Sequence, residues 1–398
     1  MMKLLELVES AATGVGRHVI DLTEGLLARG HEVHLLYSKI RRDDVFAGDL
    51  KRIQAQANLH ILHVPIQKEP GWSDIAAAGR LRRYLRLDGP FDLIHCHSTK
   101  AGLIGRLGLL GHSTKRLYTP HMLFTMDPSQ RRLITRAVGV LEATLSRACD
   151  AIIVVSGAEY EHAVALGIDP KKLCLIRNGV SLGHPISPNL DRLALRRSWG
   201  LNESDVCIGF VGRLVPQKSP ETMLRSFAAL PGRVRATARL AMVGVGPLSG
   251  ALRRLAIDLG IDARVDWLGE RDAKTLMSAF DILALTSDSE GHPLVVLEAM
   301  ARGLPIVATD VGGVSETVRH GVNGFVAPVR GVREIAAALE TLATDEVLRA
   351  RMGKASLDLV RNFSLDRMVD QTAALYSQVV SGAWKGDAAA DMKLAPMR

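Results

Sequence analysis

The sequence predicts an α/β protein made of two Rossmann-like domains, each with a parallel sheet and the two facing each other across a cleft. The chain has 398 residues, and at roughly 100–200 residues per domain this length suggests two domains. Both halves alternate short buried strands with helical segments, which is typical of parallel sheets covered by helices. Between the halves, Ser181–Leu193 contains Pro185 and Pro188 and has no periodicity, as expected of a linker.

The first half opens with a predicted strand at Leu4–Val8, followed by a glycine loop at Thr13–Gly16. A helix is expected over about Arg17–Arg29, where Gly30 ends it. The later strands predicted in this half are 33–37, 92–96, 116–119, 151–155 and 173–176.

The second half begins with a new buried strand at Ile208–Val211. The strands expected after it are 240–243, 265–268, 282–285 and 306–308. A last long helix, about Leu365–Val380, is expected to pack across both domains, and the tail from Gly382 to Arg398 is expected to fray.

The composition is that of an ordinary soluble protein, with 47% apolar and 23% charged residues. No stretch approaches the ~20 apolar residues of a membrane span, and the first ten residues resemble a strand more than a signal peptide. The four cysteines lie far apart without metal-ligand spacing, so we expect reduced thiols in a cytoplasmic protein.

Positive charge is concentrated in one stretch. Between Arg80 and Arg147 there are twelve Lys and Arg residues against four Asp and Glu, an excess equal to the net charge of +8 of the whole chain. This stretch is either a solvated basic face or a patch for anionic lipid head groups or a phosphorylated acceptor. Nucleic acid is not expected as a partner, because aromatic residues are only 4% and no nucleic-acid module is recognisable.

The segment from Glu290 to Glu298 has the most potential for binding and chemistry. It follows a predicted strand, at the sheet edge where open α/β sheets bind ligands. Pro293 suits a first helical turn, so the N–H groups of Leu294 and Val295 can hold a phosphate. Glu298, about one turn into the helix, can accept two vicinal hydroxyls of a ribose, and Glu290 would face the ligand from another side.

Two carboxylates also raise the possibility of a glycosidase acid/base pair. Such a pair works on opposite sides of one bond and needs no phosphate cradle beside it, which argues against a glycosidase. A further alternative is that Glu298 only pairs within its own helix.

Arg213 and Lys218 follow the strand that opens the second half. Two cations there can clamp a diphosphate and neutralise its charge as it leaves, although exposed surface cations are the simpler alternative. With both cations present no metal ion is expected, and Asp288 is interpreted as a residue that shapes the loop. Gly246, in a third strand-to-helix glycine turn, is either a wall of a nucleotide pocket or a turn without a ligand.

In the first half, Gly14 and Gly16 resemble part of a dinucleotide fingerprint. An NAD site also wants an acidic residue at the end of the second strand, and none stands near Ser38. The glycines are therefore expected to let the backbone approach a diphosphate or a sugar. His121 follows a strand and is favoured slightly as a site residue over a structural histidine.

His95 and His97 alternate along a predicted strand end on either side of Cys96. They are interpreted as structural residues, not as metal ligands.

Taken together, these motifs resemble the retaining GT-B glycosyltransferases of family four, the group 1 class. Glu290 and Glu298 match the family's E-x7-E motif. The other matching segments are 212–218, 244–247, 303–309 and 312–324. The resemblance is strong over 208–330 and looser over 1–180.

The resemblance implies a role for each matching residue. Arg213 and Lys218 would bind the donor diphosphate, Glu298 the ribose, and Glu290 the transferred sugar. His121 matches a histidine that touches the sugar near the reaction centre.

The remaining matches concern the rest of the donor. Gly14 and Gly16 correspond to a glycine loop under the leaving phosphate, and the base would lie along the main chain near Arg271. His292 stands where the family commonly has an aromatic or small residue.

The resemblance also implies the domain plan and the reaction. Residues 1–184 would form the acceptor domain, 195–364 the donor domain, and 365–381 a helix crossing back toward the first. The expected activity is transfer of a hexose, with retention and front-face attack, from a UDP- or GDP-sugar to a glycan or lipid-linked acceptor. No cofactor is implied. Exopolysaccharide or cell-envelope synthesis in the cytoplasm is expected, with peripheral contact at the inner face of an anionic membrane as a further expectation.

Other functions also occur on related folds. A sugar-nucleotide epimerase or a phosphorylase shares the fold, but no lysine stands in a context suited to the pyridoxal cofactor of a phosphorylase. A non-catalytic subunit would be expected to lack Glu290, Arg213 or Lys218, and all three are present.

Overall fold

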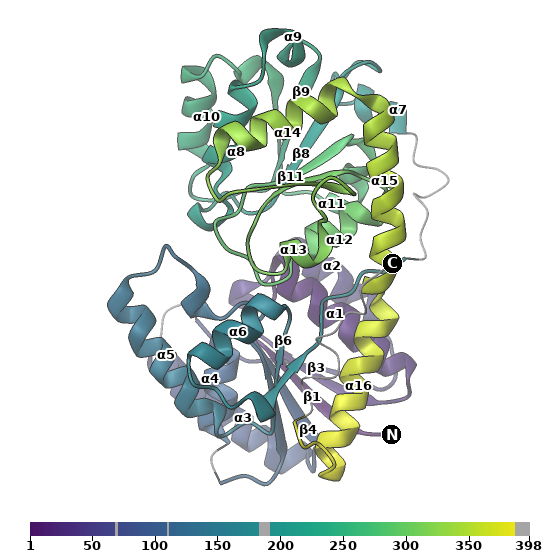
Figure 1. Ribbon diagram of the computed structural model, residues 1–398. Coiled ribbons are helices and arrows are strands. Elements are labelled where there is room, and N and C mark those ends of the chain that lie inside the picture. Colours follow the sequence, from purple (N-terminus) through teal and green to yellow (C-terminus); the bar gives the residue numbers. More distant parts are fainter. Residues whose placement is uncertain (68–70, 110, 183–191, 387–398) are drawn as a thin grey trace. The chain divides into compact units, whose positions relative to one another are not determined.

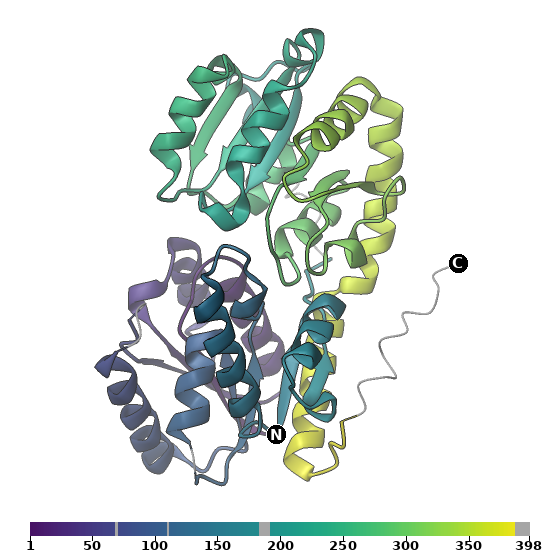
Figure 2. The same ribbon diagram turned by 60° about the vertical axis from the view of Figure 1, so that its left-hand side comes forward.

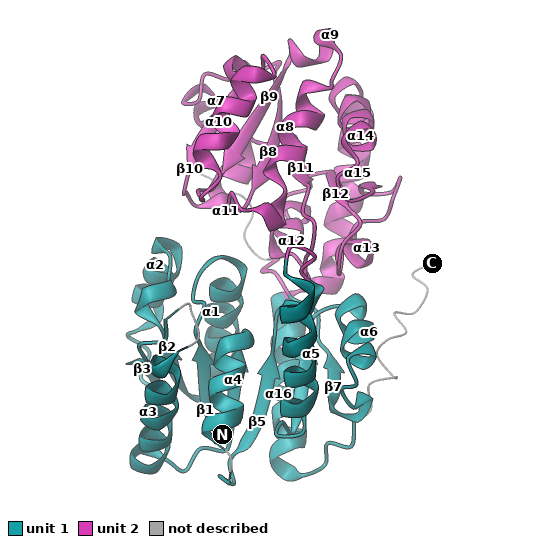
Figure 3. Cartoon of the chain, turned by 90° about the vertical axis from the view of Figure 1, so that its left-hand side faces the viewer, with its two compact units in different colours: residues 1–126, 130–178, 365–398 teal, residues 127–129, 179–364 magenta. Residues whose placement is uncertain are grey.

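The computed structural model describes residues 1–67, 71–109, 111–182 and 192–386. The chain forms two compact units (Figure 3). Unit 1 comprises residues 1–126, 130–178 and 365–398, and unit 2 comprises 127–129 and 179–364. Pro185, Pro188 and the tail beyond residue 386, which the sequence assigned to a linker and a frayed end, lie outside the described residues.

Unit 1 contains a seven-stranded sheet in the order β3-β2-β1-β4-β5-β6-β7, and its paired strands are all parallel. The strands are β1 (Lys3–Val8), β2 (Glu32–Tyr37), β3 (Leu59–His63), β4 (Leu93–His97), β5 (Lys115–Thr119), β6 (Ala151–Val154) and β7 (Leu173–Leu175). The helices are α1 (Thr13–Ala28), α2 (Asp44–Ile53), α3 (Trp72–Asp88), α4 (Thr99–Gly108), α5 (Arg132–Ser146), α6 (Gly157–Ala165) and α16 (Leu365–Ser381). Helices cover both faces of the sheet (Figures 1 and 2), so a separate apolar core forms on each face.

Unit 2 repeats this plan with a six-stranded parallel sheet in the order β10-β9-β8-β11-β12-β13. Its strands are β8 (Val206–Val211), β9 (Ala238–Val243), β10 (Val265–Gly269), β11 (Ile282–Leu285), β12 (Ile306–Thr309) and β13 (Gly324–Ala327). Its helices are α7 (Arg192–Arg197), α8 (Pro220–Ala228), α9 (Gly232–Arg235), α10 (Ser249–Asp258), α11 (Ala273–Leu276), α12 (Leu294–Met300), α13 (Val314–Thr317), α14 (Val332–Thr344) and α15 (Glu346–Val360). Two apolar cores again enclose the sheet.

The predicted fold class, two Rossmann-like domains with parallel sheets, is confirmed. Every strand predicted from the sequence is present, and the two strands that were missed, β3 and β13, both lie at the edge of a sheet. Across the described residues, no helix combines the length and the apolar character that crossing a membrane requires.

The prediction of a glycine loop at 13–16 is wrong. Helix α1 begins at Thr13, four residues before the predicted start at Arg17. The reason is tertiary, because the N–H of Thr13 donates to the carboxylate of Asp43 at 2.6 Å. That carboxylate also caps α2, where it accepts the N–H of Phe46. An acceptor from a distant segment therefore stabilises a helix start that two glycines would otherwise weaken.

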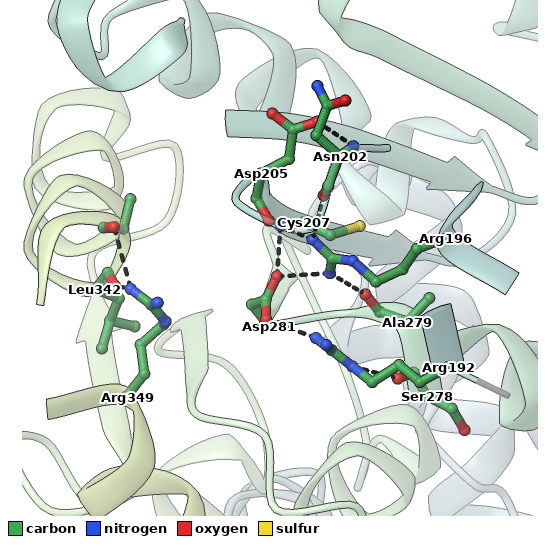
Figure 4. A network of polar contacts seen from close by, with 11 residues as sticks. Arg192, Arg196, Asn202, Asp205, Cys207, Ser278, Ala279, Asp281, Leu342 and Arg349 are labelled. Atoms are coloured by element: carbon green, nitrogen blue, oxygen red, sulfur yellow. Dashed lines mark hydrogen bonds and ion pairs between the residues drawn. The ribbon is translucent and has the colours of Figure 1, made fainter. Parts of the chain in front are cut away.

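Arginines fix the short helix α7 to unit 2 (Figure 4). The guanidinium of Arg196 is buried and donates to the Ala279 carbonyl at 2.8 Å and to Asp281 at 3.0 Å. Arg192 donates to the other oxygen of Asp281 at 2.7 Å, and Asp281 also accepts the N–H of Cys207. The Asp281 carboxylate thus joins α7 to the starts of β8 and β11. Its negative charge compensates the positive charge of the buried Arg196.

Each sheet reverses its strand order once. In unit 1 the order runs outward in both directions from the neighbours β1 and β4, and in unit 2 from the neighbours β8 and β11. Ligands of open α/β sheets bind at the carboxyl ends of the strands where the order reverses. The residues after β1 and β4, and those after β8 and β11, are therefore the candidates for function.

Candidate functional site

In unit 2, two oppositely charged side chains meet at the point where the strand order reverses. Lys218 lies on the loop after β8, and Glu290 lies on the loop after β11. The Lys218 ammonium is 2.5 Å from Oε1 of Glu290, and the two side chains are only 18% and 8% exposed. Ser287 donates its hydroxyl to the same oxygen at 2.6 Å. Lys218, predicted from the sequence to clamp a diphosphate together with Arg213, thus already shares its charge with Glu290.

Hydrogen bonds join the two loops into one rigid assembly. The N–H of Asp288 donates to the Gln217 carbonyl at 2.8 Å, and the Gln217 amide donates to the Ser289 carbonyl at 3.1 Å. Thr286 adds a bond from its hydroxyl to the Ser219 carbonyl at 3.0 Å. These contacts fix the distance between Lys218 and Glu290, so their pairing follows from the backbone rather than from chance side-chain positions.

Asp288 has a structural partner. Its carboxylate accepts from Arg330, with Nη2 at 2.6 Å and Nε at 3.1 Å. Both nitrogens donate to the same oxygen, Oδ2, and such charge-assisted bonds are stronger than bonds between neutral groups. It agrees with the interpretation of Asp288 as a residue that shapes the loop.

Two glycines of unit 2 are required by close backbone contacts. Gly312 has a φ of +50°, and a Cβ there would lie 1.9 Å from the carbonyl oxygen of Glu290. A Cβ on Gly246 would lie 2.3 Å from the carbonyl oxygen of Leu214, in the loop that carries Arg213. Gly246 thus has a packing role at the site's edge, and its part in a nucleotide pocket stays a prediction.

The other predicted residues of unit 2 lie around this pair or at the neighbouring strand ends. Arg213 and Arg271 are exposed, the first after β8 and the second after β10. Pro293 immediately precedes α12, whose first residues are Leu294 and Val295.

Glu298 and His292 complete the predicted set. Glu298 is half-buried on α12, and the carbonyl of its own residue accepts from Arg302. His292 is buried, and its ring packs against Phe363 with 5.4 Å between the centroids. The family variant at position 292 is therefore an internal contact of unit 2, and its contact with a ligand stays a prediction.

Unit 1 gathers histidines at its own reversal point. His97 is the last residue of β4, and its Nε2 lies 2.7 Å from Glu6 on β1. His121, after β5, places Nε2 at 3.1 Å from Nδ1 of His97. His18, on α1, packs edge-on against His121 with ring centroids 4.6 Å apart. The histidine predicted to be a site residue therefore belongs to a cluster at the reversal point.

A buried network supports this cluster from below. Tyr376 of α16 donates to Oε1 of Glu6 at 2.9 Å, and its oxygen lies 2.6 Å from His95 Nδ1. The other nitrogen of His95 bonds Thr119 at 2.7 Å. His95 is thereby fully committed to structure, as the sequence predicted.

Two of the clustered histidines, His18 and His121, resist protonation. Burial, reinforced by repulsion from His97, lowers the pKa of His18 to about 3. Burial and the charges of His18 and His97 likewise lower the pKa of His121 well below its usual value. Both rings are therefore neutral at pH 7 and can accept a hydrogen bond or bind a ligand through a lone pair.

The glycines at the start of α1 have different environments. Gly14 is exposed. Gly16 is buried, and a Cβ on it would lie 2.9 Å from the backbone of Ala11 and 3.1 Å from Phe46. Gly16 is therefore required by packing within unit 1, and its approach to a ligand stays a prediction.

Backbone strain marks both sites. Five non-glycine residues have a positive φ among those the structure describes, and all five lie near a strand end of these sites: Thr13, Ser98, His121, Ser219 and Arg330. Such conformations cost about 1–3 kcal/mol each and concentrate at functional sites. Ser219 directly follows Lys218, and Arg330 holds Asp288.

Several residues of these sites were not found from the sequence. Ser287 and Arg330 act through contacts with residues that were identified, Glu290 and Asp288. Glu6 offered a signal, because a charged residue inside an otherwise apolar strand must have a buried partner.

Comparisons with known proteins agree with this geometry. The family described as "Glycosyl transferases group 1" matches residues 191–358, and "Glycosyltransferase Family 4" matches residues 12–184. A protein of Actinosynnema mirum named D-inositol 3-phosphate glycosyltransferase is 31% identical over 92% of this chain and 92% of its own length. The chain is a group 1 glycosyltransferase of family 4. A protein of Corynebacterium efficiens with the same name, D-inositol 3-phosphate glycosyltransferase, is 27% identical to this chain, over 94% of this chain and 92% of its own length.

Solved structures share the fold of the glycosyltransferase. Anabaena Alr3699/HepE, in a complex with UDP and glucose, has a TM-score of 0.81 at 23% identity, covering 95% of this chain and all of that one. Sucrose-phosphate synthase from Thermosynechococcus elongatus has a TM-score of 0.80 at 23% identity, covering 96% of this chain and all of that one. At this identity the likeness establishes the GT-B fold, and the substrates of those proteins are their own.

Proposed function

We propose that the protein transfers a hexose from UDP-sugar, with retention, to a hydroxyl of an anionic polyol or glycan acceptor. The observation that carries this proposal is the Lys218–Glu290 pair at the reversal point of unit 2, with Arg213 on the same loop as Lys218. A cation and a carboxylate in one rigid assembly suit a ligand that carries a diphosphate beside a sugar. The UDP and glucose bound by Alr3699/HepE favour a UDP-sugar over a GDP-sugar.

The proposed roles follow from the contacts. Lys218 and Ser287 both donate to Oε1 of the Glu290 carboxylate, and Oε2 would accept from a hydroxyl of the transferred sugar. Lys218 and Arg213 would bind the diphosphate and stabilise the charge that develops as the glycosidic bond breaks. When the donor binds, the ammonium of Lys218 would lie between the phosphate and Glu290, which favours both anions.

The remaining donor contacts keep the roles implied by the family. Glu298 would accept the ribose hydroxyls, and the main chain near Arg271 would face the base. The family also implies that Gly14 and Gly16 would lie under the leaving phosphate and that His121 would touch the transferred sugar. In front-face attack, the acceptor oxygen bonds to the anomeric carbon from the side that the diphosphate leaves, and the hydroxyl proton passes to the leaving phosphate oxygen.

Two acceptor classes deserve a test. The name shared by the relatives in Actinosynnema mirum and Corynebacterium efficiens favours a free phosphorylated inositol. A lipid-linked or glycan acceptor of envelope synthesis is favoured instead by exposed arginines and apolar side chains on unit 1.

The basic stretch predicted from the sequence forms a surface only in part. Arg106 is buried, where it pairs with Glu142 at 2.7 Å and stacks on Tyr118. The exposed arginines lie on α3 and at α5 and are Arg80, Arg82, Arg83, Arg86, Arg131, Arg132, Arg136 and Arg147. We call them the arginine face; Figure 3 shows α3 and α5 on either side of α4.

Apolar side chains stand among these arginines. Trp72 on α3 is 86% exposed, and Leu133 and Val140 on α5 are 80% and 70% exposed. Leu133 and Val140 are seven residues apart, so they lie on one side of the helix. Exposed apolar residues flanked by arginines are typical of helices that lie in the surface of an anionic bilayer. We therefore include peripheral contact with the inner face of the cell membrane in the proposal.

The reaction is tested with purified protein and a panel of UDP-, GDP- and ADP-sugars, with D-inositol 3-phosphate and an anionic lipid-linked glycan as acceptors. We expect turnover with a UDP-sugar and a product that keeps the donor's anomeric configuration by NMR. Inversion, or a preference for GDP- or ADP-sugars, would contradict the proposal. Interconversion of the donor sugar without any acceptor would show the alternative activity, a sugar-nucleotide epimerase.

The membrane contact is tested by co-sedimentation with vesicles. We expect salt-sensitive binding to anionic vesicles, since each arginine near the surface contributes ~1 kcal/mol at low salt. The variant Arg132→Glu/Arg136→Glu should lose most of this binding, while Arg253→Glu/Arg254→Glu on α10 of unit 2 is a control of equal charge change. Equal binding to neutral and anionic vesicles would rule the contact out.

A further inference from the structure

Three histidines of unit 1 come together where the strand order reverses. His18 is on α1, His97 ends β4 and His121 follows β5. One ring nitrogen from each lies within 4.8 Å of the others. His18 and His97 are buried, and His121 is partly buried.

Two of the rings are held from outside the cluster, each through one nitrogen. His97 donates from Nε2 to the Glu6 carboxylate at 2.7 Å, so that its Nδ1 faces Nε2 of His121 inside the cluster, at 3.1 Å. His18 donates from Nδ1 to the Asn178 side-chain oxygen at 3.0 Å, which leaves a lone pair on Nε2. A histidine that donates its second nitrogen to a carboxylate or a carbonyl oxygen is the usual arrangement around a bound metal ion.

The two other groups of possible ligands in the described chain lack this property. In the group of Glu32, His34 and His60, both ring nitrogens of His34 are hydrogen-bonded. One bonds Tyr84 at 2.5 Å and the other bonds Glu32 at 2.8 Å. In the group of Glu6, His95 and His97, both nitrogens of His95 are bonded to Tyr376 and Thr119. In the first group, by contrast, the second nitrogen of His97 contacts only His121, which is itself a member of the group.

We propose that His18, His97 and His121 form a binding site for Zn²⁺ or a similar transition-metal ion. Imidazole nitrogens are common ligands of such an ion, and with three of them a fourth position stays open for water or an anion. The 3.1 Å between His97 Nδ1 and His121 Nε2 is close to the separation of two nitrogens that each lie ~2.1 Å from one ion.

His97, interpreted from the sequence as a structural residue, is a ligand in this proposed site. The site also shares His121 with the proposed function, where the same ring touches the sugar. If that role is right, Zn²⁺ should inhibit turnover, and removal of the metal should not. Metal binding itself does not depend on the role of His121 in transfer, so a direct binding measurement separates the two proposals.

The test uses the full chain, purified without a polyhistidine tag and freed of metal by a chelator. Zn²⁺ is titrated by calorimetry, and Co²⁺ is added as a spectroscopic probe of nitrogen ligation. We expect one ion per chain, a visible Co²⁺ absorption, and loss of both in His18→Gln, His97→Gln and His121→Gln. Glu6→Gln should weaken binding about 10–100-fold, while His60→Gln, in the neighbouring group, should bind as the unchanged protein does.

His121 is the least buried of the three, so His121→Gln remains informative if a core variant fails to fold. Circular dichroism establishes that each variant is folded before it is titrated. Absence of stoichiometric binding to the unchanged protein would overturn the site. So would binding that survives His121→Gln, or binding that disappears in His60→Gln.

Discussion

The pair formed by Lys218 and Glu290 can be separated into its contribution to stability and its contribution to turnover. In Lys218→Met, the Glu290 carboxylate keeps the hydroxyl of Ser287 but loses the ammonium of Lys218. Breaking a fully buried ion pair costs about 3–5 kcal/mol, and breaking an exposed one about 0.2–1 kcal/mol. Because these side chains are 18% and 8% exposed and Ser287 remains, we expect ~2 kcal/mol. For a unit of this size that lowers Tm by roughly 4–8 °C.

The same substitution should reduce turnover by ~100-fold, because the charge developing on the diphosphate is then less well compensated. The double variant Lys218→Met/Glu290→Gln removes both charges and should recover most of the lost stability. It should remain as inactive as the single variant, or more so. Between the single and the double variant, stability would thus recover while activity would not.

The measurements are calorimetric melting and initial rates with saturating donor, on the single variants, the double variant and a control. Arg225→Met is the control, because Arg225 pairs with Glu221 one turn away on the exposed face of α8. Its loss should cost no more than about 0.5 kcal/mol and leave turnover unchanged. The reasoning is refuted if Lys218→Met melts like the control, or if the double variant regains turnover along with stability.

Three further predictions follow from the same contacts. Glu298→Ala should weaken donor binding while kcat changes little, since a ribose contact is the same in ground and transition states; a selective fall in kcat would contradict this role. Turnover should persist in EDTA, and Asp288→Ala should keep most activity, since Arg330 rather than a metal occupies that carboxylate; activity restored only by magnesium would show otherwise. Unit 1 should lose stability as pH falls below ~6.5, because the unfolded state binds a proton that His18, with its pKa of about 3, does not. The slope for this group is ~1.4 kcal/mol per pH unit down to pH ~3. Urea unfolding at several pH values, compared with His18→Gln, checks it, and parallel curves would exclude this assignment.

The fold was predictable because the central strands are nearly continuous apolar segments bounded by turns. Continuous apolar sequence is typical of buried parallel strands, and it predicted β8 (Val206–Val211) and β11 (Ile282–Leu285). β3 and β13 were not predicted, because Leu59–His63 and Gly324–Ala327 are short edge strands that contain histidines or begin with glycine. Their strand conformation comes from pairing with β2 and β12, a tertiary effect that local composition does not express.

The candidate site was predictable where a residue type and its position after a strand coincide, as for Lys218 and Glu290. The sequence could not show that these two pair with each other, because 72 positions separate them. Nor could it show that Asp43 would start α1 at Thr13, or that Arg330 would hold Asp288. Each of these depends on a contact between distant segments, and such contacts are settled only by packing.

Helix α16 has a consequence for the order in which the chain can mature during synthesis. Tyr376 is fully buried in unit 1 and donates to Glu6 on the first strand, 370 positions earlier. Unit 2, apart from 127–129, is a continuous segment that ends at Ser364. A ribosome therefore finishes all of unit 2 while the Glu6 carboxylate in the nascent first unit still lacks its tyrosine. Unit 1 can therefore be completed only after all of unit 2 has been synthesised. A nascent chain halted before α16 would leave the carboxylate of Glu6 without this partner, and quality-control machinery could recognise the incomplete unit.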